Sequence, residues 1–183
     1  MYIGDLHIHS RYSRATSKEL TPEHLDLWAG KKGINIVGTG DFTHPPGGRS
    51  WLKSWSRRAG SYMLKKEYSL QRPSILGQSR PRFVISGEIS SIYKKNGRVR
   101  KVHSLILLPS LEAAEVLSRR LEAIGNIHSD GRPILGLDCH DLLAITLEAC
   151  PDASMFGPPS GPRIFHCSGH FPVLIPLKSA MRS

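Results

Sequence analysis

Two histidines one residue apart, His7 and His9, are the first side chains in the sequence whose types and spacing could do chemistry. Apolar residues alternate with them, and this alternation predicts a strand over residues 5–10. Residues two apart on a strand project from the same face, so both imidazoles would point the same way, with Asp5 behind them. Neutral imidazole nitrogens bind zinc, iron or manganese. The motif is short, so chance histidines on an edge strand explain it as well as a metal site does.

Local sequence signals predict the elements that position these histidines. Thr21-Pro22 is typical of a helix start and Gly33 of a helix end, so we expect a helix over residues 21–32. The apolar run 34–39 then predicts a short buried strand, which implies a parallel pair joined by a right-handed crossover. Asp41 follows this strand, at the end where α/β folds build sites, although a lone Asp there more often caps a helix or a turn.

A third strand and a basic hairpin come next in the sequence. Residues 82–88 form a predicted strand that ends on a carboxylate, Glu88. Asn96-Gly97 is a strong hairpin signal, because both turn residues need positive φ. The hairpin tip either contacts a phosphate backbone or is a solvated edge protected by charge. Its candidate DNA-contacting side chains are Lys94, Lys95, Arg98, Arg100 and Lys101.

The rest of the chain alternates apolar strands with helices. We expect a buried strand over residues 105–108 with His103 just before it, and a lone histidine in such a position is usually a core residue. A short apolar run at 134–137 precedes Asp138, which can cap a helix. After residue 153 the periodicity vanishes. Helices are predicted at residues 61–68, 110–124 and 140–149.

Composition limits the class of protein. At 183 residues, with 39% hydrophobic and 22% charged residues, the chain fits one soluble globular domain or part of a larger one. The net charge of +10 suggests an acidic partner such as nucleic acid. Three cysteines without C-x-x-C spacing suggest a reducing, cytoplasmic location. The sequence shows no secretion signal and no apolar run near the ~20 residues that span a bilayer, so we expect no membrane partner.

Four features occur in order along the chain: Asp5-Leu6-His7-Ile8-His9-Ser10, Gly38-Thr39-Gly40-Asp41, Gly87-Glu88, and His103 leading into Leu105–Leu108. Their order resembles a known group of proteins, the polymerase and histidinol phosphatase (PHP) superfamily, and within it the endonuclease Q family. The resemblance covers most of residues 1–45 and 60–153, and it includes longer stretches at 92–97, 107–114 and 129–137.

This resemblance implies an α/β fold, a distorted (β/α)7 barrel with the basic hairpin as an insertion. It implies two or three divalent metal ions at the C-terminal ends of the strands, with zinc, manganese, magnesium and iron all open. It also implies a DNA repair endonuclease that hydrolyses the phosphodiester bond 5′ of deaminated bases, such as uracil or hypoxanthine, or of abasic sites. Its partners would be damaged DNA and, as a further one, a replication sliding clamp.

The site residues that the resemblance implies are carried over position by position. Glu88 would be the bridging carboxylate, and Glu88 and Asp41 would be the catalytic acids. His44 is adjacent and is a further candidate. Clustered metal ions suit phosphodiester hydrolysis, because they lower the pKa of bound water and neutralise developing charge. The implied metal ligands are His7, His9, Asp41, Glu88 and His103.

Two stretches depart from the family, residues 46–59 and 154–183, and neither contains an acidic residue. In each, an alternate reading frame can spell family-like sequence. We therefore predict that residues 46–59 are out of frame and that 154–183 are a frameshifted, irregular tail. The alternative is a lineage-specific loop and tail. The family's later metal histidine is missing, and His166 and His170 in the tail receive no role.

These departures bear on activity. With residues 1–153 as the N-terminal part of the domain, the barrel would be incomplete, and we expect this copy to be impaired as an enzyme. Two other functions stay open from the sequence: a non-catalytic nucleic-acid-binding fragment, and a small-molecule phosphoesterase of the same superfamily. Fold alone does not separate them, because function depends on the site.

Overall fold

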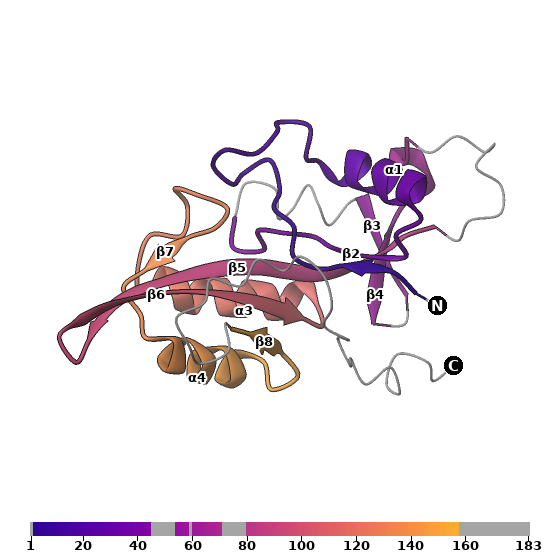
Figure 1. Cartoon of the computed structure of the whole chain (residues 1–183). Coiled ribbons are helices and arrows are strands. Elements are labelled where there is room, and N and C mark those ends of the chain that lie inside the picture. The colour runs from indigo at the N-terminus through magenta and orange to yellow at the C-terminus, as the bar shows by residue number, and fades with distance from the viewer. Residues whose placement is uncertain (1, 45–53, 59, 71–79, 158–183) are drawn as a thin grey trace.

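The computed structural model describes residues 2–44, 54–58, 60–70 and 80–157. These residues form a mixed α/β structure in which an eight-stranded sheet is covered on one face by two helices (Figure 1). No helix in the described residues is long and apolar enough to cross a membrane. The elements are β1 (Gly4–Asp5), α1 (Pro22–Lys32), β2 (Ile36–Gly38), β3 (Trp55–Arg58), β4 (Ser61–Leu64), the 3-10 helix Lys66–Tyr68, β5 (Arg82–Lys95), β6 (Arg98–Leu108), α3 (Leu111–Glu122), β7 (Ile134–Leu135), α4 (Cys139–Ala149) and β8 (Ser154–Phe156).

Strand β5 is the centre of the sheet. The strand order is β1-β2-β5-β4-β3, and β6 and β7 also pair with β5, while β8 pairs with β6. Strands β1, β2 and β5 are parallel, as the sequence predicted for the first two. Over the described residues the sheet is open: β1 and β3 lie at the ends of the main order, and β7 and β8 each pair with one strand, so the described strands do not close into the expected barrel.

Local signals predicted the helix boundaries well. Helix α1 begins after Thr21, whose side chain accepts from the backbone N–H of His24, and ends at Gly33, which has a left-handed φ of 70°. Ser110 caps α3 and Asp138 caps α4 in the same way. Each of these caps depends only on neighbouring residues, which is why the sequence alone identifies them.

Two predicted elements are wrong. Residues 61–68 are not one helix: Ser61–Leu64 is strand β4, followed by the 3-10 helix Lys66–Tyr68. Tyr62 and Leu64 are buried on alternate positions, and Tyr62 pairs across the sheet with Phe83. The strand expected over residues 5–10 ends at Asp5: strand β1 is Gly4–Asp5, which pairs with Ile36 and Val37 of β2.

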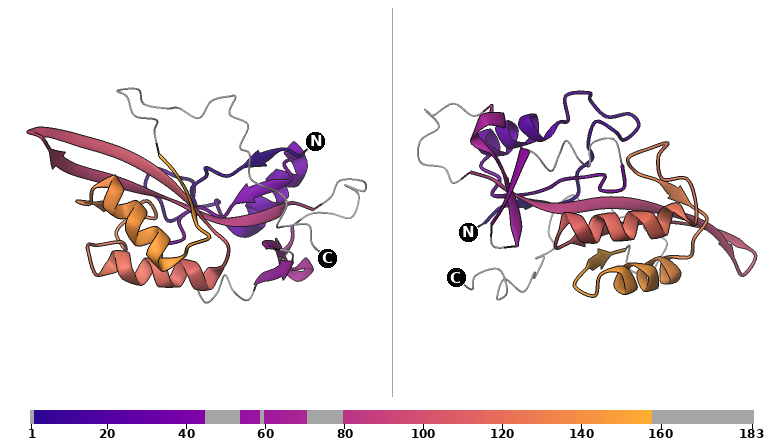
Figure 2. Two further views of the ribbon diagram at one scale, coloured as in Figure 1. Left: turned by 90° about the horizontal axis from the view of Figure 1, so that it is seen from below. Right: turned by 180° about the vertical axis from the view of Figure 1, so that it is seen from behind.

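The core lies between the sheet and the helices α3 and α4. Alternate residues of β5, including Phe83, Ile85 and Ile89, pack in this core with Leu117 and Leu121 of α3. The other face of β5 carries Glu88 and is free of these helices. Two further views agree that the β5–β6 hairpin extends past α3 and α4 (Figure 2).

The stretches predicted to be out of frame fall largely outside the described residues. Of residues 46–59, the structure describes 54–58, where Trp55 is buried against Phe83 with ring centroids 4.5 Å apart. Of residues 154–183, it describes 154–157, and Ser154–Phe156 pairs with β6 as strand β8. The frameshift itself stays a prediction.

Candidate metal centre

The histidine segment, residues 6–10, leaves β1 and lies directly against the backbone at the end of β2. A Cβ atom on Gly38 would lie 2.5 Å from the carbonyl oxygen of Leu6. A Cβ atom on Gly40, whose φ is 67°, would lie 2.9 Å from the carbonyl oxygen of Ile8. Only glycine allows such close approach, so these positions hold the segment where its histidines reach β5.

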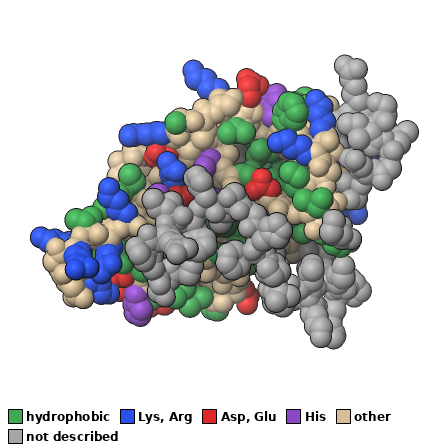
Figure 3. All heavy atoms as spheres, in the orientation of Figure 1, with side chains coloured by type: hydrophobic (Ala, Val, Ile, Leu, Met, Phe, Trp, Pro, Cys, Tyr) green, Lys and Arg blue, Asp and Glu red, His purple; other side chains and the backbone are tan. Residues whose placement is uncertain are grey.

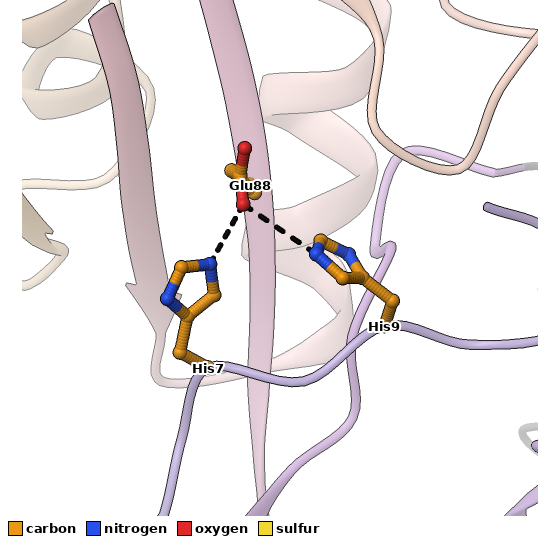
Figure 4. Close-up of side chains that lie close together, drawn as sticks. All are labelled: His7, His9 and Glu88. Atoms are coloured by element: carbon orange, nitrogen blue, oxygen red, sulfur yellow. Dashed lines mark hydrogen bonds and ion pairs between the residues drawn. The ribbon is translucent and has the colours of Figure 1, made fainter. Parts of the chain in front are cut away.

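His7, His9 and Glu88 converge at this point (Figure 4). The Nε2 atom of His7 lies 2.7 Å from Oε2 of Glu88, and Nε2 of His9 lies 3.5 Å from the same oxygen. Each residue offers one metal-binding atom, and the three atoms lie within 4.8 Å of one another. Two imidazoles and one carboxylate are a donor set that suits zinc, manganese or iron.

Glu88 is buried, with 4% of its surface exposed, yet it is the charged member of the group. Burial alone would raise the pKa of its carboxyl group, but hydrogen bonds from His7 and His103 outweigh burial and lower the pKa to about 2. The same hydrogen bond to Glu88 raises the pKa of His7. Glu88 is therefore an anion whose neighbours are all potential cations or metal ligands.

Asp41 positions His9 and does not join the three-residue group. Its φ is 49°, a left-handed conformation that Asp tolerates better than most residues. Ser10 donates to Oδ2 from both its backbone N–H (2.7 Å) and its hydroxyl (2.6 Å), and Ser13 donates to Oδ1 (2.9 Å). Although burial opposes it, hydrogen bonds from His9, Ser10 and Ser13 lower the pKa of Asp41.

The ionised Asp41 also favours one tautomer of His9. Its Oδ1 lies 3.3 Å from Nδ1 of His9, and a carboxylate can only accept. In the tautomer that donates from Nδ1 to Asp41, Nε2, the nitrogen that faces Glu88, keeps a lone pair for a metal ion. Carboxylates that orient metal-binding histidines in this way are common beside metal ions.

His103 contacts the second oxygen of Glu88. It lies on β6 directly opposite Ser90, and its Nδ1 contacts both Oε1 of Glu88 and, at 3.0 Å, the hydroxyl of Ser90. The two carboxylate oxygens thus face different histidines: Oε2 faces His7 and Oε1 faces His103. His103 is exposed and lies on the site side of the strand, and is not the core residue that its position favoured.

His44 lies apart from the three-residue group. Its ring stacks on Tyr12 with centroids 4.2 Å apart, and burial lowers its pKa. The backbone N–H of Gly131 donates to the carbonyl of Tyr12, which ties residues 126–133 to this side of the site.

Sequence reasoning assigned no role to Arg132, Ser10 or Ser13. The Nε atom of Arg132 lies 3.9 Å from Oε1 of Glu88, where a positive charge would face a bound phosphate or the carboxylate. Ser10 and Ser13 follow the histidines closely in the sequence, and that proximity was the available signal. Arg132 falls within a stretch that carried the family resemblance, but nothing local marked its contact with Glu88.

The register of the hairpin separates its basic residues onto two faces. Lys94 and Lys101 lie on the same face as Glu88 and His103, since each strand alternates and directly paired residues share a face. Lys95, Arg98 and Arg100 lie on the opposite face, where Lys95 forms an ion pair with Asp138 at 2.6 Å. All five are exposed.

No protein-family model matches the chain. An uncharacterized protein of Methanocaldococcus jannaschii is 34% identical over 142 residues, which is 77% of this chain and 14% of that protein.

Two solved structures are similar to 83% of this chain, each with a TM-score of 0.64 and 28% identity: the lesion-specific endonuclease PfuEndoQ of Pyrococcus furiosus, and endonuclease Q with a 27-mer duplex substrate that carries an abasic lesion at the active site. The chain spans 33% of each of those structures. In fold and in sequence, then, the described chain is similar to one third of endonuclease Q.

Proposed function

We propose that this chain carries the metal centre of a DNA repair endonuclease. The observation that supports it best is the convergence of His7, His9 and Glu88 in a chain whose fold is similar to a lesion-specific endonuclease. The donor atoms are of the types that bind divalent metal ions, and Glu88 supplies a buried negative charge to balance them.

In this proposal each residue has a distinct task. His7, His9 and Glu88 would hold metal, and Glu88 would bridge to a second ion that His103 also binds, because its two oxygens face different histidines. Asp41 would orient His9 and complete the ligand set. Two or three divalent ions would supply an activated water and neutralise charge on the phosphate. In this proposal, the open sheet is part of an incomplete PHP barrel.

The proposed substrate is damaged duplex DNA, cut on the 5′ side of uracil, hypoxanthine or an abasic site. A solved relative was crystallised with an abasic duplex at its active site, which favours this class. Extruding a base from the stack costs a few kcal/mol, and the cost is lower for a mispaired or damaged base. That difference would favour lesions over intact DNA before any specific contact is made.

The proposal is tested by nicking assays with end-labelled duplexes that contain uracil, hypoxanthine, an abasic site or no lesion, each with manganese, magnesium or zinc. We expect a single cut 5′ of the lesion that requires metal and is absent from the intact duplex, at a low rate because this copy is expected to be impaired. A phosphate monoester, tested in parallel, should not be hydrolysed. Monoester hydrolysis without nicking would instead indicate a small-molecule phosphoesterase.

A matched pair of histidine variants controls the assay. His9→Ala removes a proposed ligand and should reduce nicking to background. His128→Ala removes an exposed histidine that pairs with Glu122 at 2.6 Å, and it should leave nicking unchanged. Equal activity in the two variants would contradict the assigned site, and binding without cleavage by the wild type under every metal would contradict the proposed activity.

A further inference from the structure

The basic hairpin has two chemically different faces beyond the metal centre. We call residues 92–101 the hairpin arm. Its site face, continuous with Glu88, consists of Ile92, Lys94, Val99 and Lys101. Its helix face, on the opposite side, consists of Tyr93, Lys95, Arg98 and Arg100. The pairing is regular from Ile85 to Lys95, so no bulge changes this assignment.

Contacts made by the helix face support the division. The hydroxyl of Tyr93 lies 3.3 Å from Sγ of Cys139, at the start of α4, and Lys95 pairs with Asp138, the cap of that helix. This face is therefore partly covered and partly neutralised by α4. Among the ion pairs of the described residues, Lys95 is the one basic residue of the arm that is paired, and none involves Lys94 or Lys101 on the site face or Arg98 or Arg100 on the helix face.

The site face is also unusually apolar for an exposed surface next to a charged centre. Val99 is 64% exposed and Ile92 is 36% exposed. Ile134 of β7 pairs with Ser90 on the same face and is 60% exposed. Lysine ammonium groups with large apolar side chains between them match a sugar–phosphate backbone, which presents both phosphates and deoxyribose carbons. Figure 3 shows Lys and Arg side chains gathered at the tip of the arm.

We propose that the site face of the hairpin arm binds the backbone of duplex DNA beside the bond that is cut, with Lys94 and Lys101 contacting phosphates. The inference rests on the proposed nuclease function and adds a surface to it. Glu88 and Lys94 are six residues apart on one strand, so at about 3.3 Å per residue the arm reaches about 20 Å from the metal centre. That span covers about six phosphates of one DNA strand, at about 3.4 Å each along the duplex axis.

Two double variants test the inference, and each removes two positive charges from the same hairpin. Lys94→Gln with Lys101→Gln alters the site face, and Arg98→Gln with Arg100→Gln alters the helix face. Glutamine keeps much of each aliphatic stem, so packing changes little. The affinity for an intact duplex is measured with a chelator present at several salt concentrations, because this binding requires neither metal nor hydrolysis. Circular dichroism confirms that both variants fold.

We expect the site-face variant to bind several-fold more weakly. The slope of log K against log salt should fall by about 1.8, or about 0.9 for each phosphate that a lysine no longer neutralises. The helix-face variant should keep the wild-type slope. Equal reductions of affinity in both variants, or a larger reduction in the helix-face variant, would overturn the inference, as would a wild type that binds no duplex.

This experiment distinguishes a failure of the proposed endonuclease function from a failure of the proposed DNA-binding surface. A wild type that binds the duplex but never nicks a lesion contradicts the endonuclease, while the affinity difference between the two variants still decides the role of the arm. Nicking rates at saturating DNA add a second readout. They should be similar in both variants, because the lysines lie outside the metal centre and contribute to binding.

Discussion

At the scale of single residues, Glu88 is the group on which the site depends. A carboxylate with 4% exposure is costly unless it is paired, and here histidines supply every close charged partner except Arg132. Both oxygens face imidazole nitrogens, so the carboxylate already points toward the side chains that would share a metal ion with it. The burial of Glu88 is therefore consistent with a site prepared for cations.

Replacing Glu88 with glutamine should remove metal binding. Glu88→Gln keeps the shape of the side chain but loses the charge that a divalent ion needs, so we expect bound manganese or zinc, measured by elemental analysis after dialysis, to fall at least tenfold. Glu122→Gln is the matched control, because Glu122 also pairs with a histidine but is exposed. Wild-type metal content in the Glu88 variant would remove Glu88 from the ligand set.

Metal uptake should depend on pH through His7. Its pKa lies above the ordinary 6.5 because its hydrogen bond to Glu88 favours the protonated form. A protonated imidazole cannot bind metal, so affinity should fall as the pH drops through this raised pKa. Glu88, with a pKa of about 2, stays ionised and adds no change above pH 5. Equilibrium dialysis at pH 5.5 and pH 8 should show clearly less bound metal at the lower pH, and equal occupancy would contradict this assignment.

At the scale of elements, two glycines at the end of β2 determine where the histidine segment runs. A side chain at Gly38 would meet both the hydroxyl of Ser86 at 2.4 Å and the backbone of Leu6 at 2.5 Å. Backbone cannot move aside as a flexible side chain can, so the segment would have to shift as a whole. The absence of a side chain at Gly38 therefore allows His7 and His9 to lie where they do.

Gly38→Ala should therefore weaken both folding and metal binding. Overpacking of a tight contact typically costs about 1–3 kcal/mol, so we expect the free energy of unfolding in urea to fall by that amount and the metal affinity to fall with it. Gly136→Ala is the control, because a Cβ there meets nothing within 4 Å. Equal stability of the two variants would show that the segment adapts without cost.

Elements that depend on neighbouring residues could be predicted from the sequence. Elements that depend on pairing with distant parts of the chain could not. The helix caps and the Asn96-Gly97 turn, whose φ values are 52° and 73°, depend on adjacent residues. The early end of the first strand has no local signal in the sequence, and β4 pairs with the distant strand β5 through Tyr62 and Phe83. Within the site, His7, His9 and Glu88 were expected together from the resemblance. The contact between Arg132 and Glu88 could be identified only from the folded structure.

At the scale of the whole molecule, the site joins distant parts of the chain. His7 and Glu88 are 81 residues apart, and His103 comes from the next strand of the hairpin. A metal ion bound between them would cross-link the start of the chain to the centre of an open sheet. Binding that occurs only in the folded state adds directly to stability.

Metal should accordingly raise the melting temperature of the protein. At a metal concentration of about 100 times the dissociation constant, binding adds about 2.7 kcal/mol. For a chain of this size that corresponds to a rise of about 5–10 °C. Calorimetry with manganese and with a chelator should show this difference in the wild type and not in Glu88→Gln. Identical melting curves in the wild type would contradict a metal that bridges these elements.

The central place of β5 has a consequence for the chain during its synthesis. Strands β2, β4, β6 and β7 all need β5 as a partner, yet β5 begins only at Arg82. Ribosomes add about 5–20 residues per second, so His7 precedes Glu88 by about 4–16 s. During that interval the nascent chain presents its imidazoles to surrounding solutes before the carboxylate that would balance a bound ion has been made.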